Sequence, residues 1–337
     1  MPVKTEFDEL INYFFHNKES AHVYEGARGY NNSTRILERD AKKYSMRIYE
    51  THKDESKVRL EHEVLLKLND IHDLPFRVPV PLTKDGSSFL RLPSNKIGCI
   101  FNYIEGENPV FDTKDVLFSY GESVGHLMDA LGSVELEQPV IYRPYYEIEH
   151  THPSCPISKV EAWCSNPPKP FITFKKELSW IATQLTDFKR GIPKIKTLPH
   201  QLIHGDLNES NVLGNGQQTI HAILDFEFAT RDVRIMEVAV CISEILSKET
   251  NETVFLNKIH HFFSGLSTNT SLLDEEMVAL PVLIQLRRLD VFVHFLGRYL
   301  DGVDDSSILE EQIMITAANP NWLATGANKM LRLWEYE

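Results

Sequence analysis

Residues 202–213 read Leu-Ile-His-Gly-Asp-Leu-Asn-Glu-Ser-Asn-Val-Leu, and residues 222–229 read Ala-Ile-Leu-Asp-Phe-Glu-Phe-Ala. Apolar pairs flank the polar residues in both segments, which predicts that Asp206, Asn211 and Asp225 lie in turns at strand ends. Side chains at strand ends can converge in a cleft, and two carboxylates with one amide form the all-oxygen site that suits Mg²⁺. The alternative is three ordinary turn residues, because Asp and Asn favour turns. That alternative explains neither the spacing nor the apolar pairs.

The spacing of these residues is typical of a kinase catalytic loop. An aspartate is followed after four residues by an asparagine, and a metal-binding aspartate comes one hairpin later. The sequence resembles the superfamily of aminoglycoside phosphotransferases, choline kinases and homoserine kinases, whose loop reads His-Gly-Asp-x4-Asn and whose metal segment reads Ile/Leu-Asp-Phe/Trp-Glu. The matching residues are His204-Gly205-Asp206-(x4)-Asn211 and Leu224-Asp225-Phe226-Glu227. The resemblance extends over residues 20–245.

This resemblance implies a fold, a reaction and two cofactors. The fold is α+β and two-lobed like that of protein kinases, with a small β-rich nucleotide-binding lobe at 1–104 and a larger, mainly helical catalytic and substrate-binding lobe at 105–337. The reaction is transfer of the γ-phosphate of ATP to a hydroxyl of a small molecule, with Mg²⁺. Asp206 would orient that hydroxyl and receive its proton, while Asn211 and Asp225 would bind the metal.

The pattern of apolar residues agrees with such a division. It predicts a helix at 5–16, a strand at 44–49, a helix at 57–68 and a strand at 97–104. Beyond Val116 it predicts long helices, interrupted by a short β-rich island around 201–228. The helical stretches are 116–133, 171–189, 233–247, 252–265 and 274–301. The stretch 140–170 is irregular and proline-rich, which predicts a long insertion.

Further residues match nucleotide-binding positions of the superfamily. The segment from Gly26 to Asn32, which includes Gly29, stands where the family has the loop that covers the nucleotide. Arg47 stands where kinases hold a lysine against the α- and β-phosphates; arginine also binds phosphate, through a planar fork. Glu61 fits the helix glutamate that pairs with this cation, and Glu63 is the alternative.

The linker between the lobes would receive the adenine. Asn102, Tyr103 and Ile104 occupy this position, and their backbone would make the contact. The resemblance also predicts a carboxylate that braces the catalytic loop. The family usually has Asp-Leu-Ala there, whereas this chain has Met236-Glu237-Val238-Ala239, so Glu237 would reach the loop with one more methylene.

The acceptor is less clearly indicated. In the superfamily, late helices border the acceptor pocket, so Arg287, Asp290, His294 and Arg298 are candidate substrate-binding residues, although a helix that packs in the core is the simpler interpretation of this segment. An amino alcohol, a homoserine-like metabolite or a sugar would fit the reaction. Two alternatives are an antibiotic phosphotransferase of the aminoglycoside type and a catalytically silent relative that serves as a structural or binding protein.

Composition narrows the partners. The net charge of −13 argues against a nucleic-acid partner, because binding a phosphate backbone needs a basic surface. No apolar run reaches the roughly 18 residues that suggest a membrane span, and residues 1–9 lack the pattern of a signal peptide, so we expect a cytoplasmic protein. The four cysteines form no CxxC pair, and the spacing of His150, His152, Cys155 and Cys164 is not a standard zinc pattern.

Overall fold

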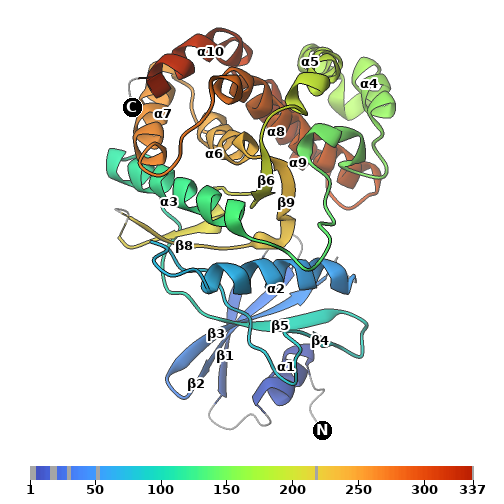
Figure 1. The fold of residues 1–337 in the computed structure, drawn as a ribbon. Coiled ribbons are helices and arrows are strands. Elements are labelled where there is room, and N and C mark those ends of the chain that lie inside the picture. Colours follow the sequence, from blue (N-terminus) through green and yellow to red (C-terminus); the bar gives the residue numbers. More distant parts are fainter. Residues whose placement is uncertain (1–4, 16–20, 29–31, 51–53, 217–218, 336–337) are drawn as a thin grey trace.

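The computed structural model describes residues 5–15, 21–28, 32–50, 54–216 and 219–335. Their elements fall into two groups: a sheet with two helices, and a larger helical assembly that contains two short β-ribbons (Figure 1). This order confirms the expected α+β fold with a β-rich N-terminal part. The boundary after residue 104 stays a prediction.

The N-terminal part is built on a five-stranded antiparallel sheet in the order β1-β2-β3-β5-β4. Its elements are α1 (Glu6–Phe15), β1 (Ala21–Arg28), β2 (Asn32–Arg39), β3 (Lys42–Tyr49), α2 (Glu55–Asn69), β4 (Leu90–Arg91) and β5 (Ile97–Asn102). Helix α2 begins at an N-cap, where the Asp54 side chain accepts a hydrogen bond from Ser56 N. It lies between the sheet and the helical part (Figure 1).

Alternation along β3 decides which side chains face the cleft. Met46 and Ile48 pack with Leu10 and Ile11 of α1 in a small apolar cluster. Arg47 and Tyr49, the residues between and beyond them, point the other way and contact α2. Successive side chains of a strand face opposite sides, so the strand separates an apolar seal under α1 from a polar face toward α2.

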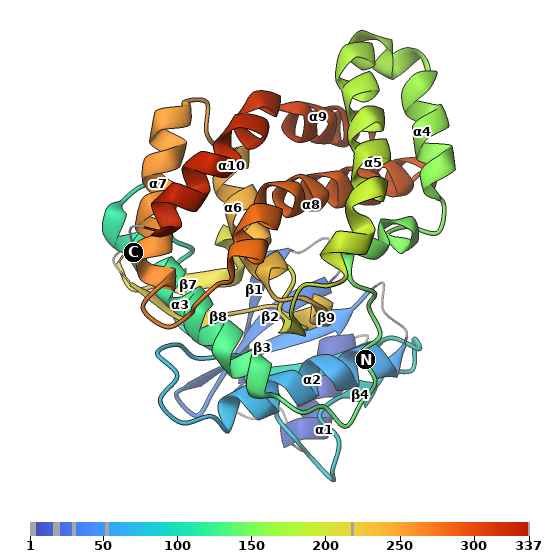
Figure 2. The ribbon, with the colours of Figure 1, turned by 45° about the horizontal axis from the view of Figure 1, so that its top comes forward.

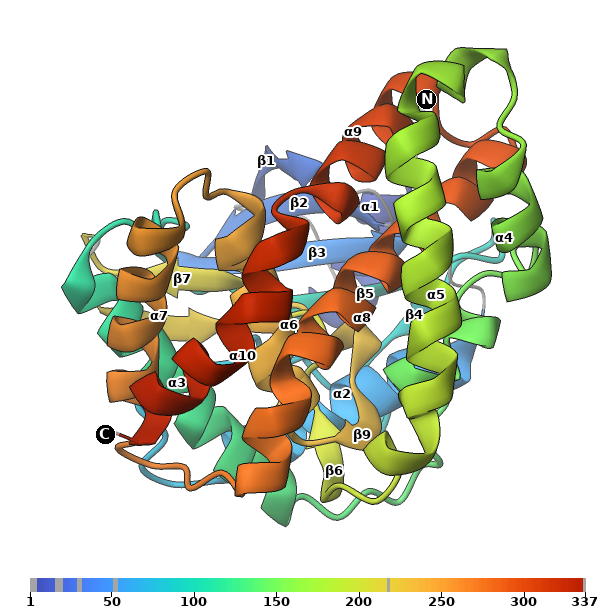
Figure 3. The same ribbon diagram turned by 90° about the horizontal axis from the view of Figure 1, so that it is seen from above.

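The C-terminal part contains eight α-helices among the described residues. They are α3 (Lys114–Ser133), α4 (Ile157–Ser165), α5 (Lys175–Ile195), α6 (Ile235–Ser247), α7 (Glu252–Leu266), α8 (Asp274–Leu300), α9 (Ser306–Ala317) and α10 (Pro320–Glu335). Helix α8 contacts α5, α6, α9 and α10 and crosses the middle of this assembly (Figures 2 and 3). Helices α3 and α7 approach so closely that a Cβ on Gly121 would lie 1.9 Å from the Phe262 carbonyl oxygen.

Two short ribbons lie between the helices and the N-terminal sheet. Strand β6 (His200–Ile203) pairs with β9 (Thr230–Val233), and β7 (Val212–Gly214) pairs with β8 (Ile220–Ile223). The predicted β-rich island is therefore confirmed, and it extends to β9. Short 3-10 turns join these strands, including Glu209–Asn211 and Phe226–Phe228.

The proline-rich stretch 140–170 contains a 3-10 helix at Tyr145–His150 and the α-helix α4. That this stretch is an insertion stays a prediction. Helix α4 buries three side chains at helical spacing, those of Ile157, Val160 and Cys164. This apolar contact stabilises a short helix between proline-rich segments. Among the described helices, none combines the length and apolar character needed to cross a bilayer.

Candidate active site

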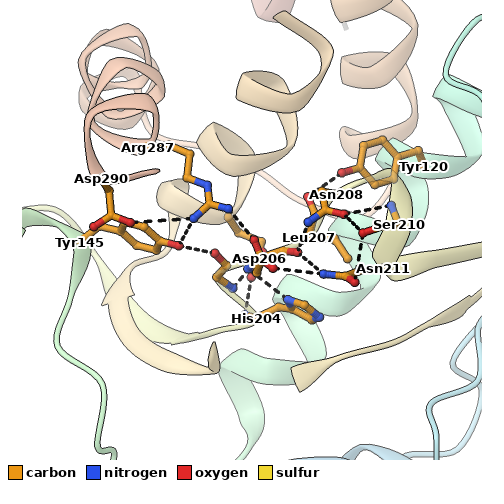
Figure 4. A network of polar contacts seen from close by, with 12 residues as sticks. Tyr120, Tyr145, His204, Asp206, Leu207, Asn208, Ser210, Asn211, Arg287 and Asp290 are labelled. Carbon is orange, nitrogen blue, oxygen red and sulfur yellow. Dashed lines mark hydrogen bonds and ion pairs between the residues drawn. The ribbon is translucent and has the colours of Figure 1, made fainter. Parts of the chain in front are cut away.

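The loop after β6 presents Asp206. Gly205 has φ +79°, a left-handed conformation that favours glycine, and it turns the chain sharply after His204. The following turn, Glu209–Asn211, is capped by Asn208, whose side chain accepts from Ser210 N at 2.9 Å. Asn211 then points back at the loop: its Nδ2 donates to the Asp206 carbonyl at 2.8 Å and to Asp206 Oδ2 at 3.2 Å. Figure 4 shows Asp206 at the centre of this network.

His204 supports the loop and has no nitrogen left for proton transfer. Its ring is fully buried. Nε2 donates to the Leu224 carbonyl at 2.9 Å, and Nδ1 accepts from Asp206 N at 3.2 Å. Because a carbonyl can only accept and a backbone amide can only donate, these contacts fix the neutral tautomer with the proton on Nε2. The ring thus ties the catalytic loop to the strand that precedes Asp225.

Glu237, on α6, braces the same loop. Its fully buried carboxylate accepts from His204 N at 2.5 Å and from Gly205 N at 3.3 Å, one oxygen for each donor. Burial raises the pKa of Glu237, and the loop amides lower it in opposition. The extra methylene relative to the family's aspartate is therefore accommodated, and the brace predicted from sequence is present.

Asp225 follows β8 in a strained conformation. Its φ of +64° and ψ of +67° place a non-glycine residue in the left-handed region, which costs on the order of 1–3 kcal/mol. Such strain is found where a structure needs a side chain in one direction. Here it brings the Asp225 carboxylate to Arg47, whose Nη1 lies 3.2 Å from Oδ1.

Arg47 joins the two parts of the chain. The same Nη1 atom also donates to Glu61 Oε1 of α2 at 2.9 Å, and the Tyr49 hydroxyl donates to Glu61 Oε2 at 2.6 Å. Glu63 is directed elsewhere and accepts from the backbone of Gln138 at 3.1 Å. Of the two glutamates considered from sequence, Glu61 is thus the partner of Arg47.

Burial and charge oppose each other in this cluster. Burial lowers the pKa of Arg47, but the carboxylates of Asp225 and Glu61 raise it more, so the guanidinium stays charged. Burial raises the pKa of Glu61 to about 7 against the influence of Arg47. One guanidinium is thus shared between the carboxyl groups of Glu61 and Asp225.

Of the remaining residues predicted to bind the nucleotide, the structure describes Gly26 and the linker residues 102–104. Gly26 lies on β1, where a Cβ would come within 2.8 Å of the Thr34 carbonyl oxygen, so the strands approach closely there. Gly29 lies outside the described residues. In the linker, the N–H groups of Asn102 and Tyr103 donate to Val80 O at 2.9 Å and Lys43 O at 3.3 Å. Ile104 packs with Leu213 and Ala222, apolar residues that can form a floor under a base.

On the other side of Asp206 lies Arg287 of α8. Its Nη2 forms an ion pair with Asp206 Oδ1, and its Nη1 donates to the Tyr145 hydroxyl at 2.7 Å. Tyr145 in turn donates to the Gly205 carbonyl at 2.6 Å. Asp290, one helical turn beyond Arg287, lies 4.0 Å from Nη1 and accepts from the Thr151 hydroxyl at 2.6 Å.

These groups line a cavity of about 230 Å³. The lining residues are Tyr145, Asp206, Phe228, Arg287, Asp290, Val291, His294, Phe295 and Arg298. The cavity adjoins a larger one of about 520 Å³ that shares Tyr145, Phe228, Asp290 and His294 with it. The structure thus brings all four late-helix candidates to the wall that carries Asp206.

Burial shapes the titration of this wall. It raises the pKa of Asp206 above its ordinary value, and the Arg287 guanidinium opposes that shift. It lowers the pKa of His294 to about 4, so this ring is neutral near pH 7. Arg298 is held by Asp304, through contacts of 2.5 and 2.7 Å. Of the two arginines that line the cavity, Arg287 is therefore the one that contacts Asp206.

Sequence reasoning missed two side chains of the site, Tyr145 and Tyr49. Tyr145 sits in the proline-rich insertion, and its backbone N–H is fixed by Asp232 of β9 at 2.5 Å. Neither this contact nor the contact of Tyr145 with Arg287 follows from local sequence. Tyr49 could have been found, because it lies two residues after Arg47 on the same face of the strand.

The residues at Asp225 fit a divalent cation that is also bound to phosphates. Among the described residues, no group of three His, Cys, Asp or Glu side chains is placed to hold a metal alone. The Asp225 carboxylate and the Asn211 amide oxygen supply oxygen donors only. Mg²⁺ commonly takes one or two such protein ligands and completes its shell with waters and substrate phosphates.

Comparison with known proteins identifies the family of this chain. The model of the phosphotransferase enzyme family matches residues 24–268. A homoserine kinase of Beijerinckia indica is 36% identical over 88 residues, which are 26% of this chain and 27% of that protein. The chain therefore spans about a quarter of the length of this curated relative.

Solved structures show the same fold at low identity. A structure of the amicoumacin kinase hAmiN with AMP-PNP, Ca²⁺ and Ami has a TM-score of 0.66 and 15% identity, with 90% of each chain covered. A microcompartment-associated aminopropanol kinase has a TM-score of 0.65 and 16% identity, with 97% of this chain and 99% of that chain covered. The protein-kinase-like fold is thereby confirmed, and the chain belongs to the phosphotransferase enzyme family.

Proposed function

We propose that this protein transfers the γ-phosphate of ATP to a hydroxyl of a small metabolite, such as an amino alcohol, a homoserine-like compound or a sugar. The observation that supports this most strongly is the position of Asp206. Its carboxylate lies between Asn211, which fits the metal site, and a cavity of about 230 Å³ that suits a small acceptor. One aspartate in contact with both is what phosphoryl transfer to an alcohol requires.

The reaction needs positioning and charge neutralisation more than covalent chemistry. The acceptor oxygen would form a bond to the γ-phosphorus while the bond from that phosphorus to the β–γ bridging oxygen breaks, and ADP leaves. Asp206 would orient the hydroxyl and receive its proton. Asn211 and Asp225 would hold Mg²⁺, which when bound neutralises phosphate charge, and Glu227 is a candidate for a second ion or for the substrate.

On the nucleotide side, Arg47 would contact the α- and β-phosphates while Glu61 and Asp225 hold it in place. Gly26 and Gly29 would belong to the covering loop. The adenine would lie against Ile104, with backbone groups of Asn102, Tyr103 and Ile104 as its polar partners. Since two linker N–H groups are already engaged, we assign the donor of this segment to Ile104 N.

The charge of the cavity wall does not separate a metabolite from a polycationic antibiotic, because Arg287 and Arg298 are paired with Asp206 and Asp304, and Asp290 also lines the cavity. A silent relative has no need for Asp206, Asn211 and Asp225 to converge on one side of a cleft.

The test compares the native protein with Asp206→Asn. We expect thermal stabilisation by Mg·ATP in both, because the substituted side chain lies on the acceptor side. ADP release with a panel of amino alcohols, L-homoserine and sugars should be lost in the variant, since essential acid–base residues contribute about 10²- to 10⁴-fold. Native-like turnover in the variant would refute the role of Asp206. If nucleotide and metal do not stabilise the native protein, the alternative of a catalytically silent relative is favoured.

A further inference from the structure

Both carboxylate oxygens of Asp206 already have a partner in the protein. Oδ1 is bound by Arg287 Nη2, and Oδ2 accepts from Asn211 Nδ2 at 3.2 Å. Arg287 and Asn211 contact Asp206 from different sides (Figure 4). Asn211 belongs to the same loop as Asp206, whereas Arg287 comes from α8 and lines the cavity. An acceptor hydroxyl would reach Asp206 from the cavity, and Arg287 Nη2 already occupies Oδ1 on that side. Arg287 therefore restrains the group that would take the acceptor's proton.

The surroundings of Arg287 allow it to change partners within the cavity. Its second nitrogen, Nη1, is held by the Tyr145 hydroxyl at 2.7 Å, and Tyr145 is anchored to Gly205. This contact would keep the guanidinium at the cavity wall while Nη2 turns to another anion. Arginine suits such an exchange because its fork can bind two carboxylate oxygens at once.

We propose that Arg287 is a latch on Asp206 that an acceptor opens with an anionic group of its own. This inference rests on the proposed phosphotransferase function and narrows its acceptor to a hydroxyl compound that also carries a carboxylate. The carboxylate binds Arg287, Asp206 Oδ1 is released, and the acceptor hydroxyl then gives its proton to Asp206 as its oxygen bonds to the γ-phosphorus. Without the carboxylate, Asp206 stays restrained and ATP is spared from attack by water.

The latch has a consequence that needs no knowledge of the natural acceptor. L-2-Aminobutanoate has the carboxylate and ammonium of L-homoserine but no hydroxyl to phosphorylate. If it opens the latch, water takes the place of the acceptor: its oxygen bonds to the γ-phosphorus, its proton goes to Asp206, and ADP and phosphate leave. Propylamine, which lacks the carboxylate, would leave the latch closed.

The experiment measures ADP release from Mg·ATP by the full-length protein. In the native protein we expect stimulation by L-2-aminobutanoate and none by propylamine. Arg287→Gln should hydrolyse ATP about tenfold faster than the native protein without any addition, a change worth about 1.4 kcal/mol, and should no longer respond to L-2-aminobutanoate. Arg287→Lys, which keeps a cation, should raise hydrolysis less. Arg190→Gln, at an exposed arginine of α5, controls for the loss of one positive charge.

A merely structural role of Arg287 predicts the opposite sign, because a distorted loop would slow hydrolysis as well as transfer. Unchanged or slower hydrolysis in Arg287→Gln, at a thermal midpoint near that of the native protein, overturns the latch. If that variant does not fold, the response of the native protein to L-2-aminobutanoate decides alone. Adding Asp206→Asn to Arg287→Gln should remove the extra hydrolysis; its survival in the double variant also overturns the inference.

The acceptor series separates this inference from the proposed function. L-Homoserine and 4-hydroxybutanoate should be better acceptors than 3-aminopropan-1-ol, which lacks the carboxylate. Equal turnover of 3-aminopropan-1-ol would overturn the latch and leave the phosphotransferase function intact. A native protein without nucleotide binding or ADP release under any of these conditions would overturn both.

Discussion

Arg47 and Arg287 are nearly equally buried, with 16% and 17% of their side chains exposed, and each contacts an aspartate of the sequence motif. Their surroundings differ. Arg47 uses one nitrogen to bridge Glu61 and Asp225, two carboxylates of the protein. Arg287 divides its two nitrogens between Tyr145 and Asp206 and lines a cavity. Burial alone therefore says little about what a buried arginine does; its partners and the space beside it say more. We call the cluster of Arg47, Glu61 and Asp225 the clamp.

The largest expected effect tests the clamp. Arg47→Met should lower kcat/KM about 10²- to 10³-fold for every acceptor, since it removes the cation that we propose contacts the phosphates. Arg47→Lys should keep activity within about tenfold of native, because a single nitrogen makes both protein contacts here and an ammonium can replace one nitrogen. Steady-state rates with two unlike acceptors measure this. A loss that depends on the acceptor would break the division between the two arginines.

The second prediction concerns the brace behind Asp206. Glu237→Gln replaces one of two accepting oxygens with a donor, which leaves a buried loop N–H unpaired and should cost about 1–3 kcal/mol. Urea unfolding of this variant is compared with Glu244→Gln, at a partly exposed glutamate of the same helix. Equal midpoints would mean that the loop on the Arg287 side holds its shape without Glu237.

A smaller effect should follow from Tyr145→Phe. This change removes the hydroxyl that accepts from Arg287 and donates to Gly205, while the ring stays in place. We expect KM for the acceptor to rise about tenfold, or about 1.4 kcal/mol, with KM for ATP unchanged. If KM for ATP rises equally, the two arginine clusters are coupled rather than separate.

The smallest effect is a pH dependence beside the clamp. Burial lowers the pKa of His62, the neighbour of Glu61, to about 3, and Arg47 adds to this shift. Below the ordinary pKa of 6.5 the unfolded chain binds a proton at His62 that the folded chain does not. The free energy of unfolding therefore decreases as the pH is lowered, by about 1 kcal/mol from pH 6.5 to pH 5.5.

His62→Gln should lack this part of the loss. Chemical unfolding at pH 6.5 and 5.5 gives the loss of unfolding free energy for each protein, and the two losses are then compared. The same loss in both proteins would show that His62 is protonated in the folded state and that the clamp region is wetter than its burial indicates.

Arg47 and Glu61 of the clamp were predictable from sequence, and the resemblance also named the four late-helix residues of the cavity wall. What it did not predict is the contact between Arg287 and Asp206. Asp206 and Asn211 are five residues apart, and the loop that joins them fixes their contact. Arg47 and Glu61 follow from a strand and the next helix in order. Arg287 reaches Asp206 across 81 residues, and its helix carries no pattern that separates a binding residue from one that packs in the core.

The same distinction explains what the sequence did not predict in the fold. Helix α4 is short and set among prolines, so composition hid its buried Ile157, Val160 and Cys164. Tyr145 depends on Asp232 of β9, a contact set by the tertiary structure. Local spacing predicted what a single turn or hairpin builds, and it could not predict what distant segments build together.

The alternation of β3 also bears on how the chain can change its length. Met46 belongs to the apolar layer and Arg47 to the face that contacts α2, so a one-residue shift of β3 against β5 would exchange their places. It would put a guanidinium into the apolar layer and a thioether beside Glu61. A two-residue shift preserves both faces. A change of length inside β3 should thus be tolerated in even numbers, whereas the turn at Asp40 and Ala41 can change length without moving either face.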